Sequence, residues 1–228
     1  MFFGYDCYFG IQAEPLLWKE DDAMAQTMTP SAESKTATVG QIDKAVANYR
    51  ALLEKHGREF NSEAVQLVLG QPELADEQFA VFRRRVKAVS NMIVRRVKVN
   101  RGRAPQEMLD ATGRKQYTNR EVVDNMPRGE GEEVEVFFFN VGLYLSDDEL
   151  EKEYELRGLK SADPYATAAV NEADPSFADE HPNGCHWKDA NGRWNCTAFY
   201  RWDDERCVLV DRRAYDWDDD WWFAGARK

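Results

Sequence analysis

The sequence has little of what a membrane or secreted protein carries. None of its apolar runs approaches the length that spans a bilayer, and its first residues lack the basic start and the cleavage site of a signal peptide. Cysteine is scarce as well, with four residues in 228: Cys7, Cys185, Cys196 and Cys207. Without a signal peptide, this cysteine usage favours free thiols in a reducing compartment. We therefore expect no membrane span and a cytoplasmic location.

The motifs of several common enzyme classes are missing. There is no P-loop, no dinucleotide-binding fingerprint and no G-x-S-x-G nucleophile motif. No cysteine–histidine pair has an identifiable orienting partner. The hydrophobic share of 43% and the aromatic share of 12% are nevertheless ample for a packed core. The sequence describes a folded chain without a catalytic signature, and we expect it not to be an enzyme.

Two groups of side chains could still hold a metal or perform acid–base chemistry. Zinc sites usually contain close ligand pairs, whereas ten residues separate Cys185 from Cys196 and Cys196 from Cys207, and only His186 is adjacent to one of them. The acidic run at 216–220 lacks the glycine and the spaced glutamate of an EF-hand loop, which favours a solvated loop. We expect no metal and no cofactor. A metal-dependent or acid–base enzyme remains the alternative.

Charge is distributed unevenly along the chain. The formal net charge is −11, which argues against nucleic acid as the main partner. Residues 83–103 nevertheless contain nine basic residues and no acidic one. Such a cluster could neutralise phosphates, so a nucleic-acid-binding module is a further alternative. We favour a solvated helix face followed by a charged connector that docks on the acidic C-terminal part of the same chain.

Composition and periodicity divide the chain into four segments. Residues 1–40 turn polar after an apolar start, and we expect a poorly ordered lead-in or linker. Residues 41–100 are expected to form a helical unit that ends in a strand edge or short basic connector. Residues 101–133 are expected to be a connector closed by the turn-rich stretch MPRGEGEE. Residues 134–228 are expected to form an α/β module, so that the fold class is α+β.

Three amphipathic helices joined by short loops are predicted in the helical unit. They begin near Gln41, Ser62 and Glu73, and Gly57 and Gly70 end the first two. Apolar residues recur along each helix at the spacing of one helix face: Ile42, Val46, Tyr49, Leu52, Leu53, Ala64, Val65, Val68, Phe79, Phe82, Val86 and Val89. In the second helix, we expect Ala64, Val65 and Val68 to point inward.

Two further helices are predicted in the C-terminal module, over about 147–157 and 164–172. Ser146 and Glu149 have the spacing of a capping box, in which each residue satisfies a free amide of the other's backbone. Asp163 precedes a proline at the first helical position, which is a favoured helix start. The module should therefore pack two helices on a sheet.

The predicted sheet is small and mostly antiparallel. We expect its first apolar strand, 134–140, and its last strand, 221–226, to lie in the same sheet. The Asn-Gly pair in DANGR predicts a hairpin turn between two further strands. Within CVLVDRR, Val208 and Val210 alternate with more varied residues, so we expect the valines to face the core. Six of the seven tryptophans fall between 187 and 222, which predicts a large rigid core there.

Four long stretches of this module resemble one protein family. They are VEVFFFNVGLYLSDDELEKEYELRGL, ADPYATAAVNEADPSFADEHPNG, HWKDANGRWNCTAFYRW and DWDDDWWFAGARK. They are similar to the variable (target) proteins of diversity-generating retroelements, and in particular to the short intracellular type found in bacteria of the candidate phyla. The resemblance is strongest over 134–228 and weaker over about 92–133.

The resemblance implies a C-type-lectin-like fold for the module. In that family an error-prone reverse transcriptase substitutes adenines of a template copy, so that AAC-type codons become any NNC codon. By position in the motif, the diversified residues that would form a ligand-binding face are Tyr200, Asp203, Asp204, Cys207, Leu209, Asp211, Arg213, Ala214, Tyr215, Asp218, Asp219 and Asp220. None of these is a type that NNC codons exclude.

The function implied by the resemblance is non-catalytic ligand binding by a hypervariable surface, residues about 200–220. Trp202, Trp217, Trp221 and Trp222 fall between the diversified positions and would form a rigid frame, as binding loops require. Many of the listed residues are aspartates, which would supply acceptors and select cationic partners. A face without a deep pocket favours a protein or peptide ligand, so we expect a protein–protein interaction.

Overall fold

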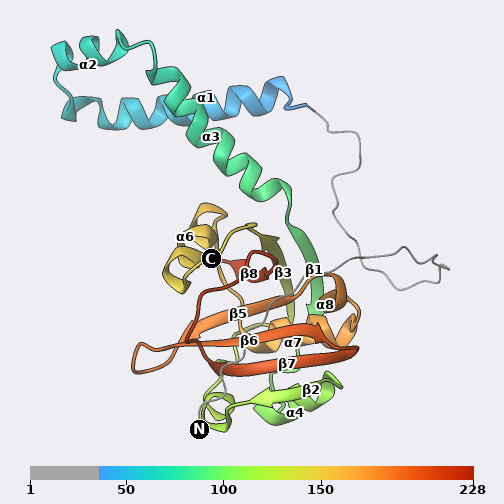
Figure 1. Ribbon diagram of the computed structural model, residues 1–228. Helices are drawn as coiled ribbons and strands as arrows, with labels where there is room; N and C mark the ends of the chain where they lie inside the picture. Colours follow the sequence, from blue (N-terminus) through green and yellow to red (C-terminus); the bar gives the residue numbers. More distant parts are fainter. Residues whose placement is uncertain (1–35) are drawn as a thin grey trace.

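The computed structural model describes residues 36–228, and within this range eight strands form one sheet (Figure 1). The strand order is β1-β3-β8-β5-β6-β7-β2, and β4 also pairs with β8. The strands are β1 Ile93–Lys98, β2 Lys115–Thr118, β3 Glu133–Asn140, β4 Leu159–Ser161, β5 Asn183–Lys188, β6 Trp194–Trp202, β7 Glu205–Arg212 and β8 Trp222–Arg227. Of the pairings, only β2 with β7 and β5 with β8 are parallel.

Helices flank this sheet and precede it, so the fold is α+β as predicted. They are α1 Val39–His56, α2 Ser62–Leu69, α3 Leu74–Ser90, α4 Pro105–Ala111, α5 Arg120–Asp124, α6 Asp147–Leu156, α7 Pro164–Ala173 and α8 Phe177–Glu180, with the 3-10 turn η1 Gly57–Glu59 after α1. Within the described residues, no helix is both long and apolar enough to cross a membrane.

The first and last strands of the predicted module pair directly. Phe138 of β3 lies opposite Ala224 of β8, and the antiparallel register runs from Phe137 to Asn140. The prediction that 134–140 and 221–226 share one sheet is therefore confirmed. The Asn-Gly turn joins β5 to β6 as an antiparallel hairpin, which is also as predicted.

Side-chain caps mark the first residues of α6 and α7, where the sequence predicts these helices to begin. The Ser146 hydroxyl accepts a hydrogen bond from the Glu149 amide, and the Glu149 carboxylate accepts one from the Ser146 amide at 2.9 Å. Asp163 accepts from the amide of Ala166 at the start of α7. Gly158 follows α6 with φ +70°, a left-handed conformation in which glycine carries no steric penalty.

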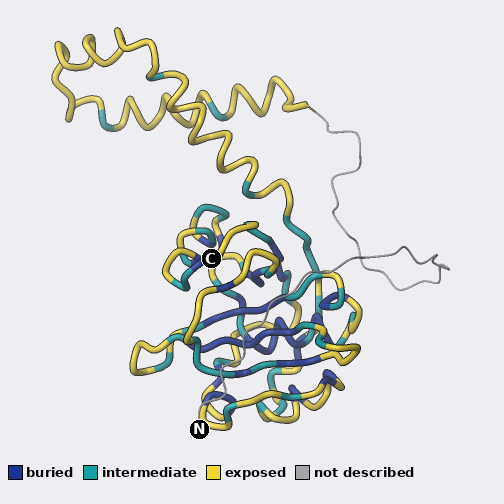
Figure 2. Tube along the Cα trace, in the orientation of Figure 1, coloured by how far each residue is buried: buried dark blue, intermediate teal, exposed yellow. Residues whose placement is uncertain are grey.

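Apolar side chains cover both faces of the sheet. One buried cluster joins α4, α5, α7 and α8 to the sheet, with Phe138, Phe199, Val208 and Val210 from the strands. A second cluster lies on the α6 side and contains Trp217. Figure 2 shows that the central strands are buried almost throughout. Because β7 is sandwiched in this way, the predicted inward orientation of its two valines is confirmed.

The module begins earlier than its predicted boundary at residue 134. Residues 93–98 form β1, which pairs with β3 instead of ending the helical unit. The predicted connector contains α4, β2 and α5, and it supplies core residues: Val99, Met108, Leu109, Val122, Val123 and Met126. The division at 100 and 133 is therefore wrong, because these short elements are fixed by contacts with the distant sheet. Residues 1–35, most of the expected lead-in, and Cys7 lie outside the described residues.

Helices α1 to α3 form an arm that extends away from the sheet (Figure 1). None of the three helices contains a buried residue, and Figure 2 shows the arm exposed along its length. The predicted inward orientation of Val65 and Val68 is wrong, because both are exposed. The helices themselves are where the sequence predicts them. They form an exposed arm rather than a packed helical unit.

Candidate functional site

The predicted diversified residues lie on the β6–β7 hairpin and in the loop from β7 to β8. Tyr200 on β6 is directly opposite Cys207 on β7, and Ala198 is opposite Leu209. Directly paired residues of antiparallel strands project to the same face. Tyr200, Cys207, Leu209 and Asp211 therefore share one face of the hairpin, and the loop continues from the end of β7.

The exposure of the twelve predicted positions is uneven. Seven are exposed: Asp203, Asp204, Ala214, Tyr215, Asp218, Asp219 and Asp220. Four are half-buried: Tyr200, Leu209, Asp211 and Arg213. The expectation that Cys207 supplies ligand contact is wrong, because its exposed fraction is 0%. It is enclosed because β7 has a strand on each side, which places Tyr200 and Lys115 next to it.

An aromatic frame supports the loop from β7 to β8. The Trp217 ring lies 5.4 Å from that of Phe223 and 5.5 Å from that of Trp221. The Trp217 backbone also exchanges hydrogen bonds with Leu145, and its indole N–H donates to the Asp147 carboxylate at 3.0 Å. Trp217 and Phe223 are buried, whereas Trp221 and Trp222 are half-buried and are less deeply placed than the sequence predicts. Trp217 is therefore the main anchor of this loop.

A tight turn presents two of the predicted aspartates. Asp203 and Asp204 have φ values of 46° and 62°, the pattern of a type I′ hairpin turn, which twists in the same sense as its strands. Aspartate tolerates this left-handed region better than most residues. Arg201 lies 3.2 Å from the Asp204 carboxylate. The turn thus holds both carboxylates outward at the end of the hairpin.

Strand β2 adds residues to this face that the sequence pattern does not indicate. Tyr117 is exposed and lies beside Leu209 in the parallel pairing of β2 with β7. The Lys115 ammonium ion-pairs with Glu205 and lies 5.7 Å from the centre of the Tyr117 ring. The segment KQYT offers only a weak strand pattern, and nothing in it indicates its parallel pairing with β7. Its position was therefore not predictable from local sequence.

The acidic loop remains solvated as the sequence predicts. Asp218, Asp219 and Asp220 are exposed, and the Asn140 amide donates hydrogen bonds to the backbone carbonyls of Asp219 and Trp221. Desolvation of its carboxylate and the neighbouring Asp218 and Asp219 raise the pKa of Asp220. In the described part of the chain, no group of three or more histidine, cysteine or acidic side chains could hold a metal ion.

Cys185 and Cys196 do not converge on one site. Cys185 belongs to the core cluster that includes α7, and Cys196 belongs to the cluster on the α6 side, so the sheet separates their side chains. Burial raises the pKa of the Cys196 thiol to about 11 and raises that of Cys185 as well. Buried thiols of raised pKa are poor nucleophiles. Their arrangement explains why the ten-residue spacing does not produce a ligand set.

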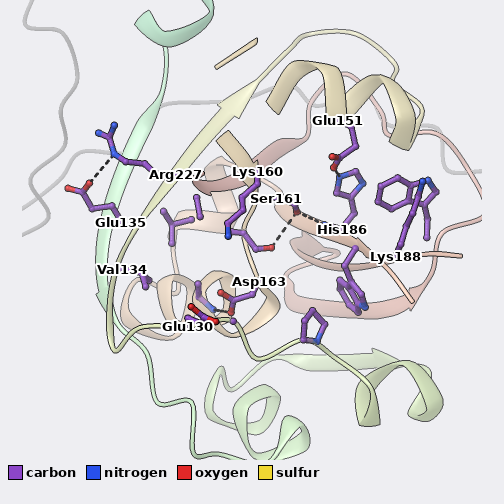
Figure 3. A pocket seen from close by; sticks show the side chains of 18 residues that line it. Glu130, Val134, Glu135, Glu151, Lys160, Ser161, Asp163, His186, Lys188 and Arg227 are labelled. Carbon is purple, nitrogen blue, oxygen red and sulfur yellow. Dashed lines mark hydrogen bonds and ion pairs between the residues drawn. The ribbon is translucent and has the colours of Figure 1, made fainter. Parts of the chain in front are cut away.

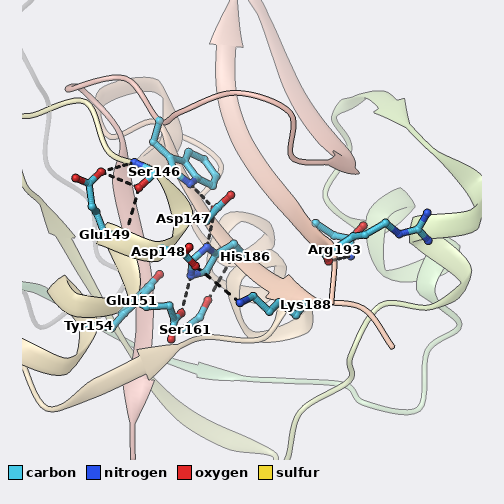
Figure 4. A network of polar contacts seen from close by, with 12 residues as sticks. Ser146, Asp147, Asp148, Glu149, Glu151, Tyr154, Ser161, His186, Lys188 and Arg193 are labelled. Atoms are coloured by element: carbon cyan, nitrogen blue, oxygen red, sulfur yellow. Dashed lines mark hydrogen bonds and ion pairs between the residues drawn. The ribbon is translucent and has the colours of Figure 1, made fainter. Parts of the chain in front are cut away.

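His186 lies at the centre of a buried polar network (Figure 4). Its Nδ1 is 2.7 Å from the Asp147 carboxylate and its Nε2 is 2.8 Å from the Glu151 carboxylate. The imidazole also stacks on Trp194 with an interplanar angle of 8°. Burial lowers the pKa of His186, and the two carboxylates raise it by more, so its net pKa is above the ordinary value. Both ring nitrogens are therefore occupied within the chain.

A cavity of about 780 Å³ lies beside this network, where the ends of β3, β4, β5 and β8 meet (Figure 3). It contains none of the twelve predicted residues. Three ion pairs within the chain occupy charged side chains of its lining: His186 with Glu151, Arg227 with Glu135, and Asp163 with Arg101. A smaller hollow of about 240 Å³ includes three predicted residues, Arg213, Ala214 and Tyr215.

The basic stretch is largely neutralised by acidic residues of the same chain. Its strand and the following loop form ion pairs: Arg95 with Asp174, Arg96 with Glu135, Lys98 with Glu133, Arg101 with Asp163 and Arg103 with Glu172. The Arg95 guanidinium also lies 4.6 Å from the centre of the Phe177 ring. This arrangement agrees with the favoured interpretation of the stretch, a connector that docks on acidic surface.

No protein-family model, curated protein or solved structure matches the chain.

Proposed function

We propose that the protein is a non-catalytic ligand-binding protein whose residues 200–220 form a retroelement-diversified contact surface. The observation that carries this proposal is the sharp separation of exposed and buried side chains along one loop. Tyr215 exposes 85% of its surface, whereas Trp217, two residues later, exposes 1%. A loop can vary in sequence only if a rigid support fixes its path. Trp217 supplies that support, and its neighbours are free to change.

The scaffold we propose for this surface is C-type-lectin-like. The pairing of the module's first and last strands, the two capped helices and the aromatic core beneath the loop all support it. The sequence resemblance to variable proteins of diversity-generating retroelements supports the same assignment. On this scaffold, β2 extends the contact surface with Tyr117.

A protein or peptide with basic side chains is the ligand class that this surface fits. Its exposed residues include Asp203, Asp204, Asp218 and Asp219, and opposite charges across an interface favour association of the correct partners. The hollow on this face, about 240 Å³, is smaller than the usual small-molecule site. Tyrosine, here Tyr215, supplies contact area at low conformational cost. We place the interaction in the cytoplasm, where the free thiols stay reduced.

The acid–base enzyme alternative has weaker support. A general base needs a ring nitrogen or carboxylate within reach of a substrate proton. Both nitrogens of His186 instead face Asp147 and Glu151, and the imidazole is buried. The aspartates at 218–220 lie in an exposed loop, away from any described cavity of ligand size.

The test is the DNA that flanks the coding sequence. We expect a near-repeat of the 3′ coding end beside a reverse-transcriptase gene, with mismatches confined to template adenines. These mismatches should fall in codons for the exposed and half-buried positions and should spare those for Trp217 and Phe223. A near-repeat without adenine bias, or the absence of both the repeat and the reverse transcriptase, would overturn the proposal.

A further inference from the structure

The helical arm exposes apolar side chains that a stable helix normally buries. Most helical stability in proteins comes from packing an amphipathic face. Yet α1 and α3 cross, with one hydrogen bond from Gln78 to the Tyr49 hydroxyl. Both helices contain only exposed or half-buried residues. Within residues 36–228, the arm therefore has no surface against which its apolar face packs.

The exposed residues of α3 form a seam with coiled-coil spacing. Ala75, Phe79, Phe82, Val86 and Val89 follow one another at intervals of four and three residues, which is the a/d pattern of two helices that pack along their length. The four large members of this seam are all exposed. Helix α1 carries a similar series: Val39, Ile42, Val46, Tyr49 and Leu53.

The charges beside the α3 seam have opposite signs in its two halves. Asp76 and Glu77 lie in the first turn, whereas residues 83–87 contribute three arginines and a lysine. In a parallel pair of α3 helices the basic halves would repel each other. In an antiparallel pair, Phe79 of each copy packs against Phe82 of the other, and Asp76 comes opposite Arg83 of the second copy. The helix is therefore complementary to itself in one orientation.

We propose that the arm is a dimerisation element and that its partner is a second copy of this chain, with the two α3 helices packed antiparallel. This pairing uses one patch on both subunits, as a two-fold symmetric interface does. The arm extends from the sheet at β1, on the side away from β2 and the β6–β7 hairpin (Figure 1). A dimer joined through the arms therefore leaves β2 and the β6–β7 hairpin of both copies open, and it presents two of these surfaces to a multivalent ligand.

The test is the solution mass of the full-length chain and its variants by sedimentation velocity and light scattering at micromolar concentrations. We expect twice the mass of one chain. Phe82→Glu should raise the dimer dissociation constant by roughly 100-fold, since it places a charge at the centre of the seam. The control is Val81→Glu, which makes the same change one residue away. Val81 is 62% exposed and lies off the seam, whereas Phe82 is 52% exposed, so this variant should remain dimeric.

Charge exchange tests the orientation. Asp76→Arg should weaken the dimer because it faces Arg83 of the second copy, and adding Arg83→Asp should restore it. Glu77→Arg, on the outer side of the helix, should leave the mass unchanged. A monomeric wild-type chain would overturn the proposal and would assign the apolar face to residues 1–35 or to another partner. The antiparallel arrangement would be overturned if Phe82→Glu and Val81→Glu weakened the dimer equally. It would also be overturned if the double variant with Asp76→Arg and Arg83→Asp did not regain the mass of a dimer.

Discussion

Tyr215 and Trp217 lie two residues apart in the β7–β8 loop, yet one side chain points into solvent and the other is enclosed by Leu145, Trp221 and Phe223. This contrast is what a contact surface on a fixed support requires. It also makes the two roles separable by mutation, because exposed positions and buried anchors have different energetic costs when they are changed.

Substitutions at the exposed positions should hardly change stability. Tyr215→Ala, Asp203→Asn and Asp218→Ala are expected to alter the free energy of unfolding by less than about 0.5 kcal/mol. Trp217→Ala should cost about 3–5 kcal/mol, because it removes a large buried ring and leaves a cavity. Chemical denaturation monitored by circular dichroism measures both sets. Comparable losses in the two sets would contradict the division between surface and frame.

Cys207 is the exception among the predicted diversified residues. Because it is fully buried between Tyr200 and Lys115, Cys207→Tyr should destabilise the chain by about 1–3 kcal/mol through overpacking. Cys207→Ala, which fits the same space, should cost less. The native thiol should also react slowly with a thiol reagent until the chain unfolds. Fast labelling in the native state would show that this position is open to ligand after all.

His186 should make stability depend on pH above neutrality. Its pKa is raised from the ordinary value of 6.5, because its two carboxylate partners outweigh its burial. A base whose folded pKa is raised stabilises the fold fully below its unfolded pKa. This contribution is lost as pH rises through the folded pKa. We therefore expect the free energy of unfolding to fall above pH 6.5, by at most about 1.4 kcal/mol per pH unit.

His181 provides the control for this prediction. Burial lowers its pKa, and Arg95 adds to this, while Glu180 and Asp174 oppose it. A base of lowered pKa costs stability as pH falls through 6.5, and it contributes no decline in stability as pH rises above this value. In thermal melts between pH 6.5 and about 8.5, the His181→Gln variant should therefore retain the decline, and the His186→Gln variant should lose it. A decline that survives in the His186→Gln variant would assign the effect to another group.

Adding a methyl group at two glycines compares a crowded position beside Trp217 with an open position in α1. A Cβ added at Gly184 would lie 2.7 Å from the Thr197 carbonyl oxygen and 3.3 Å from the Trp217 ring. Since the backbone of a central strand cannot yield easily, Gly184→Ala should cost about 1–3 kcal/mol. Gly40 lies in α1 with open space around it, so Gly40→Ala should stabilise that helix by about 0.5–1 kcal/mol. Thermal denaturation and helix content from circular dichroism measure the pair.

The elements that the sequence predicts well are those fixed by neighbours in the chain. The Ser146–Glu149 capping box spans four residues, and the left-handed Gly158 ends its helix through its own backbone freedom. The hairpin between β5 and β6 depends on the short turn 189–193, in which Gly192 takes a left-handed conformation with φ +76°. In each case the determining contacts lie within the segment, so local pattern is enough.

The elements that the sequence does not predict depend on distant partners. Lys115 on β2 lies beside Cys207 on β7 although 91 residues separate them by number, and β1 belongs to the sheet through β3. The same reason explains the error at Cys207: alternation within β7 indicates its face, but enclosure comes from strands on both sides. The stretch of sequence that forms the candidate site was therefore predictable. The burial of Cys207 within it and the contribution of Tyr117 from β2 were not.

The last prediction concerns where the independently folding part of the chain begins. The sheet module includes β1, and α4 and α5 place Leu109, Val122 and Val123 in its main core. A chain of residues 92–228 should therefore fold and unfold cooperatively, since the arm supplies no buried residue.

The shorter chain 134–228 loses two strands and those core side chains. We expect it to be unfolded or aggregated, because each buried aliphatic side chain contributes roughly 1.5–3 kcal/mol. Circular dichroism and hydrogen exchange distinguish the two. A well-folded 134–228 chain would show that the predicted boundary is sufficient and that β1, β2, α4 and α5 only cover the module from outside.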